Sequence, residues 1–143
     1  MEQKPNLPQN IIADSSALIS LVVTTDINNT RARSILAAVS KAEHAIVIPS
    51  EVFAETINLL GKKFTHAQAV EAALLILNAD MFIIKPSTAV MRQNALKVFE
   101  KVPKGVSYTD CLVMAVADIH GTTNVLGFDN IFRKSGYHLP SVK

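Results

Sequence analysis

The chain has 143 residues, of which 49% are hydrophobic and 18% charged, and its formal net charge is only +2. This length suits one domain with a sizeable core. The balanced charge does not by itself indicate nucleic-acid binding. The single cysteine, Cys111, excludes an internal disulfide and a multi-cysteine zinc site. No apolar run is long enough to span a membrane, and residues 1–9 are polar and unlike a signal sequence, so we expect a cytoplasmic protein.

Apolar strand patterns alternate with helical patterns, which favours βαβ units and a parallel sheet. We interpret residues 1–9 as an N-terminal tail and residues 10–140 as one domain. The expected strands are 11–13, 45–48, 81–84 and 124–127, with an edge strand near 137–139. The expected helices are 15–23, 29–41, 51–64, 66–78, 87–101, one from 107 or 109 to 121, and a short one ending near 136. The prediction is a three-layer α/β/α domain with a mainly parallel sheet of four to five strands.

Four carboxylates stand in a similar relation to these elements. Asp14 and Asp129 each follow an expected strand directly. The carboxyl ends of parallel strands share one edge of a sheet, where such folds place their sites. Glu55 shares a helical face with Val52, and we expect that apolar face to look inward. Asp110 opens a helix whose own face is apolar further down, whereas Asp118 lies about 80° around that helix and is expected at the rim.

Taken singly, each strand-end aspartate is explained as well by a helix cap or a turn. Taken together, four carboxylates in one pocket repel one another unless a cation joins them. A hard divalent ion with oxygen ligands, Mg²⁺ or Mn²⁺, suits such a pocket. The chemistry that follows is metal-assisted hydrolysis of a phosphodiester.

The motifs around these carboxylates resemble those of the PIN domain family. The resemblance rests on four segments in order, namely 11–18, 48–55, 108–112 and 127–132 followed by Gly136 and Tyr137. It implies that Asp14, Glu55, Asp110 and Asp129 form the metal and catalytic site. Ser16 and Thr109 would support the first and third acidic residues.

The resemblance also implies a function. Such proteins are most often VapC-type toxin ribonucleases that use Mg²⁺ or Mn²⁺, form homodimers and pair with a small antitoxin protein. One position departs from the family pattern: Gly127 stands where Thr or Ser is common. A second hypothesis is therefore a catalytically poor module of the same fold that acts by binding a partner protein or RNA.

Basic residues near the motif-bearing segments are candidates for contacts with RNA phosphates. They are Lys62, Lys63, Arg133 and Lys134. The helix pair from Val52 to Leu77 carries more large apolar residues than one buried face needs, which favours a homodimer.

Overall fold

The computed structural model describes residues 8–140, so most of the expected N-terminal tail lies outside the described residues. The helical and strand elements alternate as predicted. The strands are β1 (Ile11–Ala13), β2 (Ile46–Pro49), β3 (Phe82–Lys85) and β4 (Val125–Leu126). The helices are α1 (Ser15–Val22), α2 (Asn29–Lys41), α3 (Ser50–Lys63), α4 (His66–Asn78), α5 (Ala89–Phe99), α6 (Tyr108–Ile119) and α7 (Asn130–Lys134).

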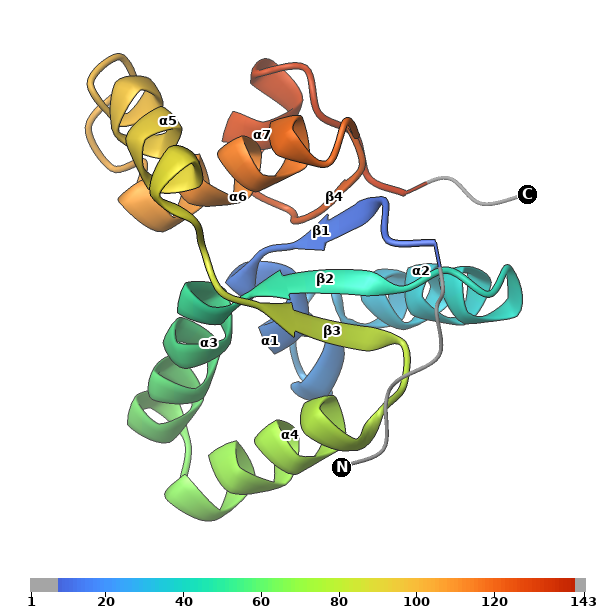
Figure 1. The fold of residues 1–143 in the computed structure, drawn as a ribbon. Helices are drawn as coiled ribbons and strands as arrows, with labels where there is room; N and C mark the ends of the chain where they lie inside the picture. Colours follow the sequence, from blue (N-terminus) through green and yellow to red (C-terminus); the bar gives the residue numbers. More distant parts are fainter. Residues whose placement is uncertain (1–7, 141–143) are drawn as a thin grey trace.

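The four strands form one parallel sheet in the order β3-β2-β1-β4 (Figure 1). The chain builds outward from β1 through β2 to β3 and then returns to place β4 on the other side of β1. Because crossovers between parallel strands are right-handed, α1 to α4 cover one face and α5 and α6 the other. The predicted three-layer α/β/α architecture is confirmed.

The expected edge strand near 137–139 is reduced to a single parallel bridge between Asn124 and His138. Backbone hydrogen bonds still hold this segment against β4: Val125 N donates to His138 O and His138 N donates to Thr123 O, both at 2.8 Å. The sequence predicted four to five strands, and the sheet within residues 8–140 has four.

Helix α6 is the centre of the core. Its seven residues from Cys111 to Ala117 are all buried, and so are the strands β1 and β2. A helix that is apolar on all sides has to be enclosed by other elements. The first turn of α6 is the part that emerges from this enclosure, and it carries Asp110.

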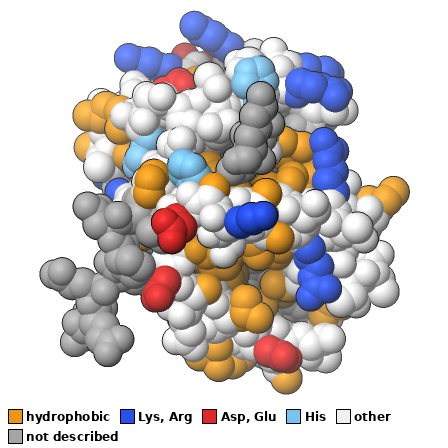
Figure 2. All heavy atoms as spheres, turned by 90° about the vertical axis from the view of Figure 1, so that its right-hand side faces the viewer, with side chains coloured by type: hydrophobic (Ala, Val, Ile, Leu, Met, Phe, Trp, Pro, Cys, Tyr) orange, Lys and Arg blue, Asp and Glu red, His pale blue; other side chains and the backbone are white. Residues whose placement is uncertain are grey.

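The order of the strands also fixes where a site can form. β1 lies between the two halves of the sheet, so the chain diverges at the carboxyl ends of β1 and β4. Figure 2 shows the opposite end, where the strands begin; there side chains of both charges are scattered among hydrophobic ones. No helix within residues 8–140 is long and apolar enough to cross a membrane.

Candidate metal centre

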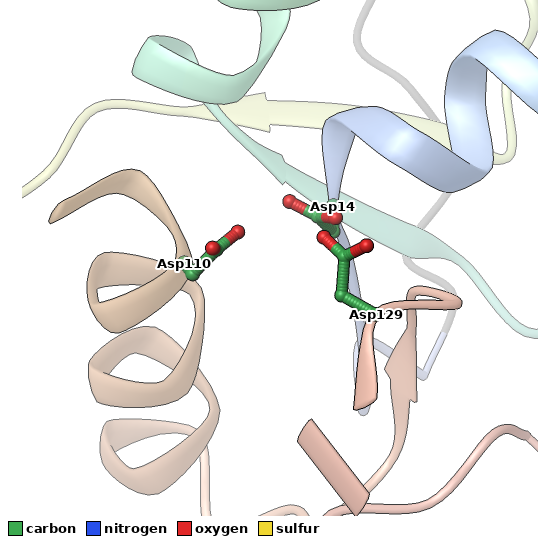
Figure 3. Close-up of side chains that lie close together, drawn as sticks. All are labelled: Asp14, Asp110 and Asp129. Atoms are coloured by element: carbon green, nitrogen blue, oxygen red, sulfur yellow. The ribbon is translucent and has the colours of Figure 1, made fainter. Parts of the chain in front are cut away.

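Three aspartates converge at the point where the sheet diverges. One carboxylate oxygen from each of Asp14, Asp110 and Asp129 lies within 4.8 Å of the others. Figure 3 shows Asp14 between β1 and α1, Asp129 in the loop after β4, and Asp110 reaching toward both from α6. Three of the four carboxylates predicted from the sequence are thus brought together.

Asp14 is the most deeply placed of the three, with 1% of its surface exposed. Its Oδ2 caps α1, accepting a hydrogen bond from Ser16 N at 3.3 Å and one from Ser16 Oγ at 2.8 Å. Its Oδ1 is buried and has no hydrogen-bond partner among residues 8–140. A buried carboxylate oxygen without a partner is costly unless a proton or a cation reaches it.

Burial and mutual repulsion of the carboxylates raise pKa values within the cluster. Burial raises the pKa of Asp14 from 3.8 to about 7; the Ser16 hydrogen bond opposes the rise, and the charges of Asp110 and Asp129 add to it. Partial burial, and then the charge of Asp110, also raises the pKa of Asp129. A divalent ion bound between the three carboxylates would relieve both effects.

Asp110 has a structural role as well as a place in the cluster. Its backbone N–H donates to Ser107 Oγ at 3.0 Å, and its Oδ2 accepts from Ser107 N at 3.1 Å, which makes a capping box at the start of α6. Asp110 can therefore cap α6 and also belong to the aspartate cluster. The cap fixes the side chain at the mouth of the pocket.

Glu55 is not part of the group whose oxygens lie within 4.8 Å of one another. The buried face of α3 runs through Val52, Thr56 and Leu60, not through the predicted face of Val52, Glu55 and Leu59. Thr56 can be buried because its hydroxyl donates to Val52 O at 2.7 Å. Glu55 directly precedes the buried Thr56 and is half-buried at the margin of this face. The sequence had predicted Glu55 itself on the buried face.

The predicted supporting residues differ in what they contact. Ser16 Oγ donates to Asp14 and also accepts from Phe128 N at 3.4 Å, so it joins the segment after β1 to the segment after β4. Thr109 lies in the first turn of α6 beside Asp110. Asp118 is exposed in the last turn of α6, about 12 Å along the helix from Asp110. Its Oδ1 accepts a hydrogen bond from Tyr137 Oη at 2.6 Å.

Gly127 is explained by packing. A Cβ built on it would lie 2.7 Å from Phe132 Cε2 and 3.1 Å from the Cβ of Asp14. The ring of Phe132, which is buried, takes the place where a Thr or Ser side chain would extend. In this chain an aromatic ring, that of Phe132, therefore packs beside Gly127 and Asp14 where other members of the family would have a hydroxyl group.

The basic residues proposed for RNA contacts fall into two groups. Lys62 and Lys63 are in the last turn of α3, about 18 Å along the helix from its start at the site edge. Arg133 and Lys134 are on α7, directly after Asp129, and Arg133 lines a recess beside that aspartate. The sequence did not identify Arg31, which lines the same recess from α2.

A second acidic residue at this edge has a different environment. Glu51, in the first turn of α3, accepts hydrogen bonds from Ser50 Oγ at 2.8 Å and from Ser87 Oγ at 2.5 Å, one on each carboxylate oxygen. Burial alone would raise its pKa, but these hydrogen bonds and the charge of Arg92 lower it overall. Glu51 is therefore satisfied by its own neighbours, unlike Asp14.

Comparison with known proteins identifies the family. Residues 11–136 match the family model of the PIN domain. The fold matches the crystal structure of Mycobacterium tuberculosis VapC20, described as a toxin that cleaves the sarcin–ricin loop. The TM-score is 0.78 and the sequence identity 23%, over 90% of this chain and 96% of that one. No curated protein matches the chain. Because the family match covers most of the chain, the protein belongs to the PIN domain family.

Proposed function

We propose that this protein is a metal-dependent endoribonuclease that hydrolyses RNA phosphodiester bonds. The single observation that carries the proposal is the convergence of Asp14, Asp110 and Asp129 with one buried Asp14 oxygen left unpartnered. An all-oxygen, all-carboxylate set is the ligand chemistry that Mg²⁺ and Mn²⁺ prefer. Such an ion activates a water molecule and stabilises negative charge on a phosphodiester.

The chain's own residues have distinct tasks in this proposal. Asp14, Asp110 and Asp129 would hold the ion. The Ser16 hydrogen bonds fix one oxygen of Asp14 and leave the other, Oδ1, as the atom that would hold the ion. The capping box does the same for Asp110.

Cleavage in the presence and absence of a chelator tests the proposal. Purified protein is incubated with structured and unstructured RNAs in Mg²⁺ or Mn²⁺, and then with excess chelator. We expect cleavage with either metal and none with the chelator. Cleavage that persists under chelation would contradict the proposal, because no metal would then be needed.

Glu55 is proposed as a fourth acidic residue that acts from the margin of the cluster. Its half-buried position on α3 places it outside the close group of three. Residues that support a metal site from outside its ligand shell typically contribute about 10–100-fold to activity or metal affinity. We therefore expect Glu55→Gln to keep measurable cleavage, whereas loss of a direct ligand should abolish it.

We further propose that the protein is the toxin of a toxin–antitoxin pair, as the family resemblance implies; the description of VapC20 calls that protein a toxin. Expression of the parent should then arrest growth, and expression of Asp14→Asn should not. Growth arrest by both proteins would show that toxicity does not depend on the proposed site.

A homodimer is proposed from the exposed apolar residues of α4. Leu74, Leu75 and Leu77 each expose about half of their surface, whereas Ile76 is buried. Three half-exposed leucines on one helix form an apolar surface that a second copy of the chain would cover. Light scattering at micromolar concentration should give twice the mass of the chain, and a monomer would contradict the proposal.

A further inference from the structure

A small recess opens beside the aspartate cluster. It has a volume of about 240 Å³ and Asp129 forms part of its wall. Arg31 from α2, Phe128 after β4, Arg133 from α7 and His138 from the C-terminal segment line it as well. Arg31 and the segment 125–139, which are distant in sequence, therefore meet at this recess.

The two arginines of the recess are held in place by neighbours. The Arg31 guanidinium lies over the Phe128 ring, 5.6 Å from its centroid, within the range of a cation–π interaction. Arg133 Nη2 donates to Asn130 Oδ1 at 3.2 Å. Both arginines are exposed to solvent, so their remaining N–H groups are open to a ligand.

The charges explain what these arginines can do for a substrate. The neighbouring cluster carries three carboxylates, and an RNA strand carries a negative charge on each phosphate. A strand that approaches the cluster is repelled unless cations lie on its path. Arg31 and Arg133 supply two positive charges next to Asp129, on one side of the cluster.

The volume limits the kind of ligand. Pockets that enclose a complete small molecule usually measure roughly 300–1,000 Å³, so this recess is small. A ligand that fits it is best understood as one unit of a longer molecule whose next part lies over the aspartates. Unpaired nucleotides of RNA have this form, with a phosphate for arginine and a base for the recess.

We propose that this recess is a subsite for the nucleotide next to the scissile phosphate, with Arg31 and Arg133 bound to its phosphate and Phe128 acting as a positioning residue for Arg31. The inference rests on the proposed ribonuclease function and adds to it the route of the substrate. It assigns to Arg31 a role in binding, and it assigns this role to Arg133 ahead of Lys62 and Lys63.

Binding of a short fluorescent single-stranded RNA tests the subsite without cleavage. Anisotropy is measured with excess chelator over a range of salt concentrations. Arg31→Gln and Arg133→Gln should each weaken binding about tenfold, because each removes a charge-assisted hydrogen bond. Each should also lower the slope of log affinity against log salt by about 0.7, the value expected for one phosphate contact on a single strand.

Arg33→Gln is the matched control. It changes the same residue type on the same helix, but Arg33 lines a separate groove between α1, α2 and α4 and not the recess. We expect its affinity and salt slope to equal those of the parent. Phe128→Leu should weaken binding less than Arg31→Gln does, and should have no further effect when combined with Arg31→Gln.

The outcomes separate the subsite from the ribonuclease proposal. If Arg31→Gln and Arg133→Gln bind RNA as the parent does, or if Arg33→Gln loses as much, the subsite is wrong even when the parent cleaves RNA. If the parent binds no RNA, the subsite is also wrong. If the arginine variants lose binding as expected while the parent fails to cleave with metal, the subsite stands and the ribonuclease proposal fails.

Discussion

Asp14 and Glu51 are two acidic residues at the same edge of the sheet, and they differ in what surrounds their oxygens. Glu51 has a hydroxyl donor on each carboxylate oxygen and a lowered pKa. Asp14 has donors on one oxygen only, two carboxylates as neighbours and a raised pKa. The comparison distinguishes a carboxylate that its neighbours satisfy from one that keeps a buried oxygen without a partner. The second kind is the one that the proposed metal site uses.

The largest expected effect comes from removing the charge of Asp14. Asp14→Asn should lower metal-dependent RNA cleavage by at least about 1,000-fold, because the proposed metal site would lose its most buried carboxylate. It should also remove the rise in melting temperature that Mn²⁺ gives the parent, since a ligand stabilises only the state that binds it. Metal-free stability should be unchanged or higher, because Asn caps a helix about as well as Asp and carries no charge.

Glu51→Gln is the matched control for that substitution, because it removes one carboxylate charge from the same edge. It should cleave RNA within about threefold of the parent and keep the Mn²⁺-induced rise in melting temperature. An equal loss of cleavage in both variants would show that general charge at this edge matters and that Asp14 has no special role.

The next largest expected effect is on the pH dependence of stability, to which Asp14 and Glu51 contribute with opposite signs. The folded state holds a proton on Asp14 up to about pH 7, whereas the unfolded state releases it near 3.8. The free energy of unfolding of the metal-free protein should therefore fall as pH rises through this window, by about 2 kcal/mol between pH 5 and pH 8. Glu51 contributes with the opposite sign, because its stabilisation is lost as pH falls below its ordinary value of 4.5.

Chemical denaturation at several pH values, with chelator present, measures this profile. In Asp14→Asn the decline between pH 5 and pH 8 should become clearly smaller. A decline that is the same in the parent and in Asp14→Asn would assign it to another group. Added Mn²⁺ should stabilise the parent more at pH 8 than at pH 5, since protons and metal ions compete for the same oxygens.

A side chain added at Gly127, next to Asp14, should have the next largest effect on stability and cleavage. Gly127→Ser places a side chain against Phe132 and the Cβ of Asp14. Overpacking of this kind costs about 1–3 kcal/mol of stability, and a displaced Asp14 should also lower cleavage. Combining it with Phe132→Leu should recover part of both losses. If Gly127→Ser alone is neutral in thermal melts and in cleavage, the floor of the pocket is more adaptable than the packing indicates.

The smallest expected effect is the stability change in Glu51→Gln. The amide keeps one acceptor oxygen but loses the charged hydrogen bonds to Ser50 and Ser87. Since the site is partly exposed, the expected cost is about 1 kcal/mol at neutral pH. Denaturant midpoints of parent and variant measure it. A more stable variant would mean that the Glu51 charge is strained and not satisfied.

Much of the site was predictable because the sheet imposes it. Asp14 and Asp129 follow strands directly, and parallel strands bring their carboxyl ends together whatever the intervening sequence. Asp110 was predictable because the helix that it opens is apolar further down on the same face, and the fold buries that part of the helix.

The sequence was less informative in two situations. In one, a polar side chain forms its hydrogen bond within its own helix; in the other, a residue contacts a partner far along the chain. Glu55 was assigned to the buried face of α3 because it shares a face with Val52 and Leu59. The face that the fold buries runs through Thr56 instead, whose hydroxyl bonds to its own helix. Arg31 was missed because its partner, Phe128, belongs to a segment far along the chain. Only the folded arrangement of α2 and β4 reveals that contact.

The pairing of β1 with β4 has a consequence for the timing of activity during protein synthesis. Ile12 in β1 pairs with Val125 in β4. The edge of the sheet that carries Asp14 and Asp129 therefore forms only after β4 has been synthesised. Contacts this distant form late, after most of the chain is available. A growing polypeptide that ends before Val125 lacks Asp129, β4 and α7 together, and with them the complete acidic cluster. On the proposed ribonuclease function, a chain that is still being synthesised and ends before Val125 cannot yet cleave RNA.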